Sequence, residues 1–169
     1  MDPVEICRRL GDTKIKAIFH ELTTEGMKKI LKEAKVPTVR LPSHTSTKKR
    51  NDDWAAKTWR AVADKASVGV AATLLFEWLT RTRRPMLASF LTSIEVQHDN
   101  GLTDADFMTS APPEKLIEAG KKLLEGFDKQ EVAAYLLFLD ASNKSEIFQP
   151  LDLAPIVGPA PAPAPAAAG

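Results

Sequence analysis

Three arginines, Arg81, Arg83 and Arg84, fall within four positions and are followed directly by Pro85. Such a cluster can form an anion site, because the helix that begins at the proline also offers free backbone amides to a negative charge. The alternative is a corner between two helices. The residue before a proline leaves the α region, and cations favour the last turn of a helix. We favour the corner, and we keep the three arginines as candidate anion-binding or nucleic-acid-binding residues.

A second basic cluster, Lys48, Lys49 and Arg50, lies in the stretch 37–51, which has two prolines and little apolar content. No apolar neighbour explains these cations, so they are the leading candidates for contacts to the phosphates of DNA or RNA. Residues 1–85 carry a net charge of +8 and residues 86–169 a net charge of −7. This asymmetry fits an anionic partner of the first half, or two halves that attract each other within one fold, which we favour.

The segment MKKILKEAKVPT, residues 27–38, resembles the first half of a SAP motif, a small helix–extended–helix unit that binds DNA. The apolar positions and the Pro-Thr pair of that motif fall on Met27, Leu31, Val36, Pro37 and Thr38. The second half departs from the motif, because polar residues at 50–52 replace its apolar positions. The resemblance implies nucleic-acid binding by the basic N-terminal half.

The chain contains none of the catalytic motifs GxSxG, HExxH, GxGxxG and GxxxxGK[ST]. Its single cysteine, Cys7, has apolar neighbours, so we expect a core position rather than a nucleophile. The strongest polar cluster is His98, Asp99, Asp104 and Asp106. Their spacing does not match a calcium-binding EF-hand loop, and a turn followed by a capped helix explains them. We therefore expect a non-enzymatic protein with no metal, no cofactor and no small-molecule ligand.

The composition favours a cytoplasmic protein without a membrane partner. One cysteine permits no disulfide within the chain, and the acids within residues 1–10 do not fit a signal peptide. The longest apolar region, 68–79, is interrupted by Glu77 and is shorter than the roughly 20 residues that span a bilayer.

Apolar residues at spacings of three and four predict amphipathic helices along almost the whole chain. The segment VGVAATLLFEWL, 68–79, is apolar nearly all round and is predicted to be the central, most buried helix. Glu77 and Arg81 are expected to pair on the wettest strip of that helix. VAATLLF at 70–76 and VAAYLLF at 132–138 match at six of seven positions. The match indicates either a duplicated helical hairpin or the shared composition of buried helices.

We predict an all-α fold: a compact multi-helix bundle of stacked helical hairpins, with a short helical N-terminal module and a disordered Pro/Ala tail. The predicted units are an N-terminal helical module at 1–36, a flexible basic linker at 37–51, a helical bundle domain at 52–149 and the tail at 150–169. Proline at every second position of the final segment prevents a regular helix. The predicted function is a protein–protein interaction or adaptor module, and the alternative is a nucleic-acid-binding protein.

Overall fold

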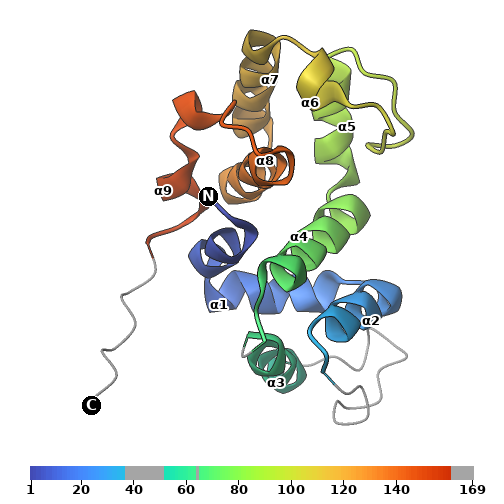
Figure 1. Ribbon diagram of the computed structural model, residues 1–169, viewed down its shortest axis with the longest axis vertical. Coiled ribbons are helices and arrows are strands. Elements are labelled where there is room, and N and C mark those ends of the chain that lie inside the picture. Colours follow the sequence, from blue (N-terminus) through green and yellow to red (C-terminus); the bar gives the residue numbers. More distant parts are fainter. Residues whose placement is uncertain (37–51, 64, 161–169) are drawn as a thin grey trace.

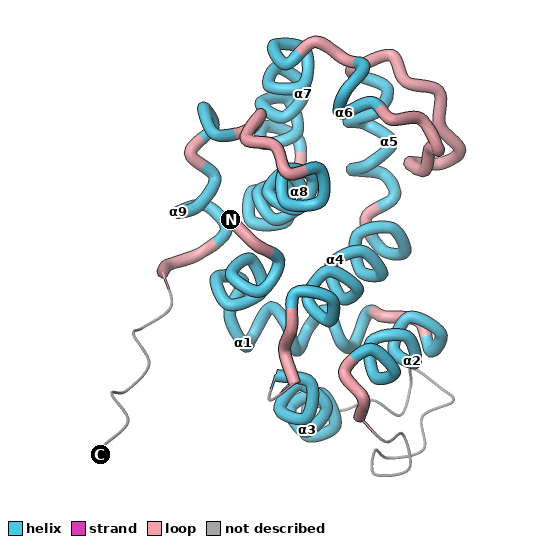
Figure 2. The backbone as a smooth tube through the Cα atoms, viewed as in Figure 1, coloured by secondary structure: helices cyan, strands magenta, loops and turns pink. Residues whose placement is uncertain are grey.

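The computed structural model describes residues 1–36, 52–63 and 65–160 of the 169-residue chain. All regular elements in these residues are helices, and strand-like pairing is limited to one bridge between Asp99 and Leu102. Figures 1 and 2 show the helices packed into one all-α bundle, as the sequence predicts. In chain order they are α1 (Pro3–Glu21), α2 (Thr24–Glu33), α3 (Asp52–Ala63), α4 (Val68–Thr82), α5 (Arg84–Ser93), α6 (Phe107–Ser110), α7 (Pro113–Gly126), α8 (Lys129–Asn143), the short 3-10 helix η3 (Gln149–Leu151) and α9 (Leu153–Val157).

α1 begins with a capped first turn, in which the Asp2 side chain accepts a hydrogen bond from the Glu5 amide at 2.8 Å. Pro3 occupies the first helical turn, where its missing amide hydrogen has no cost. At Gly11 the backbone leaves the helical region, with φ 77° and ψ 161°. Gly11 therefore kinks α1 without ending it, and Figure 1 shows the two arms of the helix running in different directions.

α2 and α3 precede and follow the segment 37–51. Met27, Ile30 and Leu31 form the buried stripe of α2, with its lysines on the exposed side. α2 packs against α4, and α3 packs against α1. The predicted linker itself lies outside the residues that the structure describes.

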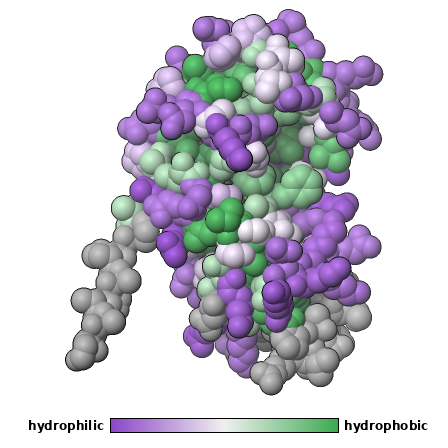
Figure 3. Space-filling model, in the orientation of Figure 1, coloured by the Kyte–Doolittle hydropathy of each residue, from purple (hydrophilic) through white to green (hydrophobic). Residues whose placement is uncertain are grey.

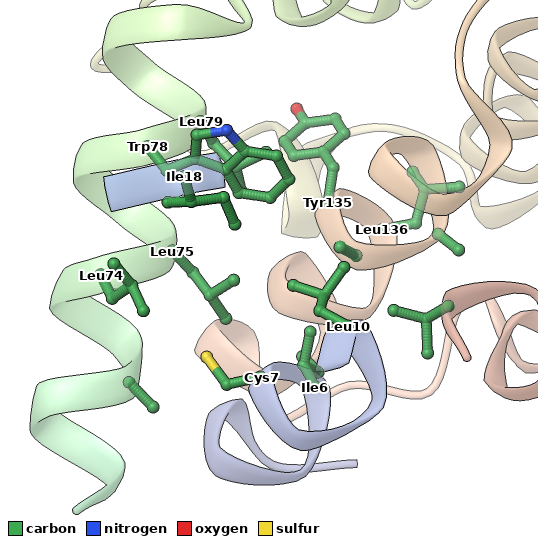
Figure 4. Packing of buried hydrophobic residues seen from close by; sticks show 14 of the residues in the cluster. Ile6, Cys7, Leu10, Ile18, Leu74, Leu75, Trp78, Leu79, Tyr135 and Leu136 are labelled. Atoms are coloured by element: carbon green, nitrogen blue, oxygen red, sulfur yellow. The ribbon is translucent and has the colours of Figure 1, made fainter. Parts of the chain in front are cut away.

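α4 is the helix around which the others pack, because α1, α2, α5 and α8 all lie against it. Leu75 and Trp78 are fully buried, and Figure 4 shows α4 side chains directed toward α1 and α8. The Trp78 indole N–H donates a hydrogen bond to Glu21 at 3.3 Å. The prediction of a central helix from its apolar composition is confirmed.

The second half of the chain continues the bundle through α5, α7 and α8, with α7 packed against both of the others. The turn at 98–101 brings the chain back beside α5. Asn100 and Gly101 have positive φ angles there, and a Cβ atom on Gly101 would lie 2.6 Å from the Arg84 carbonyl oxygen. Only glycine fits this close approach. Asp128 caps α8 by accepting a hydrogen bond from the Glu131 amide, as the spacing predicts.

The folded region extends further toward the C-terminus than the sequence predicts. The tail was expected from residue 150, but η3 and α9 follow, and α9 packs against α8 and α1. Leu153 and Val157 are buried, and the Arg9 guanidinium donates to the carbonyl oxygens of Ala154 and Gly158. The reason is that two apolar residues four apart bury one helical face, which the proline content of the segment obscures. Residues 161–169 lie outside the described part of the chain.

One hydrophobic core runs through the described residues from Ile6 to Val157, and α1 and α2 belong to it together with α4 and α8. The boundary between 1–36 and the bundle stays a prediction about sequence units. Within the described residues, no helix is both long enough and apolar enough to cross a membrane.

Candidate functional site

The arginine cluster lies at the corner between α4 and α5. α4 ends at Thr82, Arg83 lies between the two helices, and α5 begins at Arg84. The Arg83 guanidinium donates to Glu131 at 2.7 Å and pairs with Glu21 at 2.8 Å. Its central carbon also lies 5.3 Å from the centre of the Trp78 ring, within the range of a cation–π contact. Arg83 thus ties the corner to α1 and α8.

Lys14 of α1 completes this ion network, because its ammonium group lies 2.6 Å from Glu131. Burial tends to raise the pKa of the Glu131 carboxyl, but hydrogen bonds and charges from Arg83 and Lys14 outweigh it and lower the pKa. Burial likewise tends to lower the pKa of Arg83, and its contacts with Glu131 and Glu21 raise it. Two cations and two anions therefore neutralise one another at a partly buried position, with Glu131 the least exposed of the four side chains and Glu21 the most exposed.

The other two arginines also have protein partners. Arg84 donates to the backbone carbonyls of Thr80 and Asn100. Arg81 lies 3.6 Å from Glu77, so the predicted i,i+4 pair exists. The predicted position of that pair on the wettest strip is wrong, because the Glu77 side chain is only 2 % exposed and also pairs with Lys29 of α2 at 2.6 Å. α2 covers this face of α4, which the sequence of α4 cannot indicate.

In the structure, each of these three arginines, Arg81, Arg83 and Arg84, therefore contacts a different set of protein groups. Their proposed role in binding an anion stays a prediction. Lys48, Lys49 and Arg50 lie outside the described residues. His98 accepts a hydrogen bond from the Gly101 amide, and Asp106 caps α6. Among residues 1–36, 52–63 and 65–160, no group of three or more His, Cys, Asp or Glu side chains can hold a metal ion.

The most distinctive surface feature is an apolar groove between α4, α5 and α8, closed at one side by the turn and loop at 101–107. Figure 3 shows apolar surface gathered in a hollow at the middle of the visible face, where Figure 1 places these helices. We call it the α4–α5–α8 groove. The polar residues that line it are Thr80 of α4 and Thr103 and Asp104 of the loop. Its apolar lining is formed by Phe76, Leu79, Leu87, Leu91, Leu102, Phe107, Tyr135, Phe138 and Leu139.

Two exposed side chains mark the groove. Phe76 of α4 is 52 % exposed, and Leu102 of the turn is 39 % exposed. α1 and α2 cover other faces of α4, so the strip that carries Phe76 remains open. Phe138 enters the groove from α8. Phe76 and Phe138 are the last residues of the two matching heptapeptides, so the repeated sequences supply equivalent phenylalanines to one surface.

Sequence reasoning did not single out these groove residues. One signal in the sequence could have found them. α4 has apolar residues on nearly all its faces, which is more apolar surface than its neighbouring helices cover. Comparison of the chain with protein families, curated proteins and solved structures finds no significant match.

Proposed function

We propose that the protein is a non-enzymatic interaction module that binds an amphipathic helix of another protein in the α4–α5–α8 groove. The observation that carries the proposal is Phe76, a large aromatic side chain that is 52 % exposed in a groove lined mostly by apolar residues. Exposed apolar surface bordered by polar groups marks interaction sites in monomeric proteins. Aromatic side chains at such sites supply much of the binding energy.

The architecture favours a helix as the bound element. A partner strand needs a sheet edge, and the described residues contain helices and one isolated bridge only. A helix that enters an apolar groove needs anchors at positions i, i+3, i+4 and i+7. Each anchor that is fully buried contributes about 1.5–3 kcal/mol of transfer free energy.

The test is selection of binding peptides from a library of amphipathic helices, followed by fluorescence anisotropy with the purified protein. We expect selected peptides to share apolar anchors at helical spacing. Phe76→Glu should weaken their binding by more than about tenfold, which corresponds to 1.4 kcal/mol. Phe127→Glu is the matched control, because Phe127 is an exposed phenylalanine, 37 % exposed, that does not line the groove. Selected peptides whose affinity is equal in both variants would place the interaction elsewhere.

The second candidate function is nucleic-acid binding through the basic N-terminal half. It is supported by Lys28, Lys32 and Lys35, which are exposed in or just after α2, immediately before the segment that contains Lys48 to Arg50. A gel-shift series with DNA and RNA at low and moderate salt tests it. Binding should fall steeply with salt, and neutralising Lys48, Lys49 and Arg50 should flatten the salt dependence by up to about three phosphate contacts. No binding at low salt would remove this candidate.

A further inference from the structure

A second cavity, separate from the α4–α5–α8 groove, lies between α1, α3 and the start of α4. It has an empty volume of about 490 Å³, which includes its open mouth. Its walls are almost entirely apolar, and they include Val4, Trp59, Val62 and Leu74. Arg8 is the one charged side chain among the described residues that line it.

The cavity stays open because the side chains that line it are either small or held in place. α3 and α4 present Ala63 and Ala71 to it, which leave space between the helices. The Trp59 indole N–H donates to Asp12 at 2.9 Å, and its ring packs on Phe19 with the ring centres 6.2 Å apart. This hydrogen bond and ring contact hold the indole at the wall, so it does not swing in to fill the space.

The two adjacent arginines of α1 have different surroundings. Arg9 pairs with Glu5 at 2.8 Å and holds the carbonyl oxygens of Ala154 and Gly158. Arg8 is exposed, and it forms no hydrogen bond or ion pair with any residue that the structure describes. A guanidinium group with five free donors at the mouth of an apolar cavity is suited to a carboxylate, which it binds through two parallel hydrogen bonds.

Cys7 forms part of the cavity wall, and Figure 4 shows its sulfur directed from α1 toward α4. Burial, with a smaller contribution from the charge of Asp2, raises the pKa of the Cys7 thiol to about 12. The thiol is therefore neutral at physiological pH and behaves as a small apolar group. Among the wall residues that the structure describes, none carries a negative charge that would compete with a ligand for Arg8.

We propose that this cavity binds an amphipathic monocarboxylate, such as a medium-chain fatty acid, with its carboxylate on Arg8 and its apolar chain against Trp59, Val62 and Leu74. Burial of the apolar chain supplies one part of the affinity. The paired hydrogen bonds of the carboxylate to Arg8 supply the other part and fix the orientation of the ligand. The proposal does not depend on the α4–α5–α8 groove, because the two cavities share no lining residue.

Calorimetric titration of the full-length protein with octanoate tests this proposal. We expect saturable binding that is weaker for butanoate, which buries less chain, and weaker for octanol, which has no carboxylate. Arg8→Gln should lower octanoate affinity by more than about tenfold. Arg60→Gln is the matched control, because Arg60 is an exposed arginine of α3 that does not line the cavity. Absence of saturable octanoate binding, or equal affinity in the Arg8 and Arg60 variants, overturns the proposal.

A further measurement locates the chain of the ligand. Ala63→Leu adds volume at the cavity wall and should weaken octanoate binding while the melting temperature stays close to that of the wild type. An octanoate affinity that is unchanged in Ala63→Leu would show that the ligand binds outside the cavity.

Discussion

At the scale of single residues, position in the bundle decides what a charged side chain does. Arg83 and Arg84 are neighbours in sequence, yet Arg83 contacts the carboxylates of two other helices and Arg84 contacts backbone carbonyls. Glu131 is central to the network, because it receives both Arg83 and Lys14 and has a side chain only 13 % exposed. The ion network joins α1, the α4–α5 corner and α8 through this one carboxylate.

The first prediction concerns Glu131→Gln. Loss of the charge leaves Arg83 and Lys14 without their shared partner, so the free energy of unfolding at neutral pH should fall by about 2–3 kcal/mol. The pKa of Glu131 is lower in the folded protein than in an ordinary glutamate. Its contribution is therefore present above the ordinary pKa and is lost as the pH falls through the lower, folded value.

Melting temperatures measured from neutral pH to about pH 3 check this prediction. The difference between the wild type and Glu131→Gln should shrink as the pH falls. Glu118→Gln is the control, since Glu118 pairs with Lys122 at the exposed surface and its substitution should change stability little. Parallel acid dependence of the wild type and Glu131→Gln would show that the network contributes no pH-linked stability.

The second prediction concerns Gly158, where the chain after α9 touches α1. Gly158 has a φ angle of 152°, and a Cβ atom there would lie 1.8 Å from the Arg9 carbonyl oxygen. Gly158→Ala should therefore displace the end of α9 and lower stability by about 1–3 kcal/mol. In chemical denaturation, Gly126→Ala serves as the control, because nothing lies within 4 Å of its added Cβ. Equal stability of the two variants would contradict the docking of α9 on α1.

At the scale of elements, α4 has two kinds of apolar surface. One part is covered by α1, α2 and α8, and it holds Leu75 and Trp78. The other part carries Phe76 and forms a wall of the α4–α5–α8 groove. The same helix therefore supports the core and the proposed interaction site. This explains why α4 contains more apolar residues than a single buried face requires.

The third prediction separates these two surfaces. Leu75→Ala should lower the free energy of unfolding by about 2–5 kcal/mol, because the cavity it leaves lies in the centre of the bundle. Phe76→Ala, one residue further along, should have a much smaller effect, since half of the side chain is already in water. Urea titration of both variants measures the difference. A loss for Phe76→Ala as large as that for Leu75→Ala would mean that the groove is part of the core.

At the scale of the whole molecule, one hydrophobic core includes residues from several of the predicted sequence units. α1 lies against α3, α4, α8 and α9, so residues from the first and last parts of the chain meet in one cluster. Figure 1 shows α1 between the C-terminal helices and α3. The opposite net charges of the two halves meet directly in the contacts of Arg83 and Lys14 with Glu131.

The fourth prediction follows from this shared core. A fragment of residues 52–160 lacks α1 and α2, which cover Leu75 and Trp78, and it should not unfold cooperatively. The full chain should show one transition, with equal calorimetric and van't Hoff enthalpies. Scanning calorimetry of both proteins checks this. A cooperative transition in the fragment would establish 1–36 as an independent module.

Local features could be predicted from the sequence because they depend on neighbouring residues only. Asp2 with Pro3 specifies the start of α1, and the residues before Pro85 specify the corner between α4 and α5. Gly11 indicates an interruption of the helix, which the structure shows to be a kink and not an end. The backbone preferences of glycine and proline and the reach of a capping side chain act over a few residues. The apolar composition of 68–79 likewise indicated a central helix without any knowledge of its neighbours.

Only the tertiary structure decided which apolar and charged groups remain exposed and can contact a ligand or a partner. The sequence does not distinguish exposed Phe76 from buried Leu75, or exposed Arg8 from hydrogen-bonded Arg9. Burial depends on which distant segments cover each face, as α2 covers Glu77 and α9 covers part of α1. The α4–α5–α8 groove and the cavity beside Arg8 both lie where such covering stops, because each combines two consecutive helices with one that is distant in the sequence, α8 in the groove and α1 in the cavity.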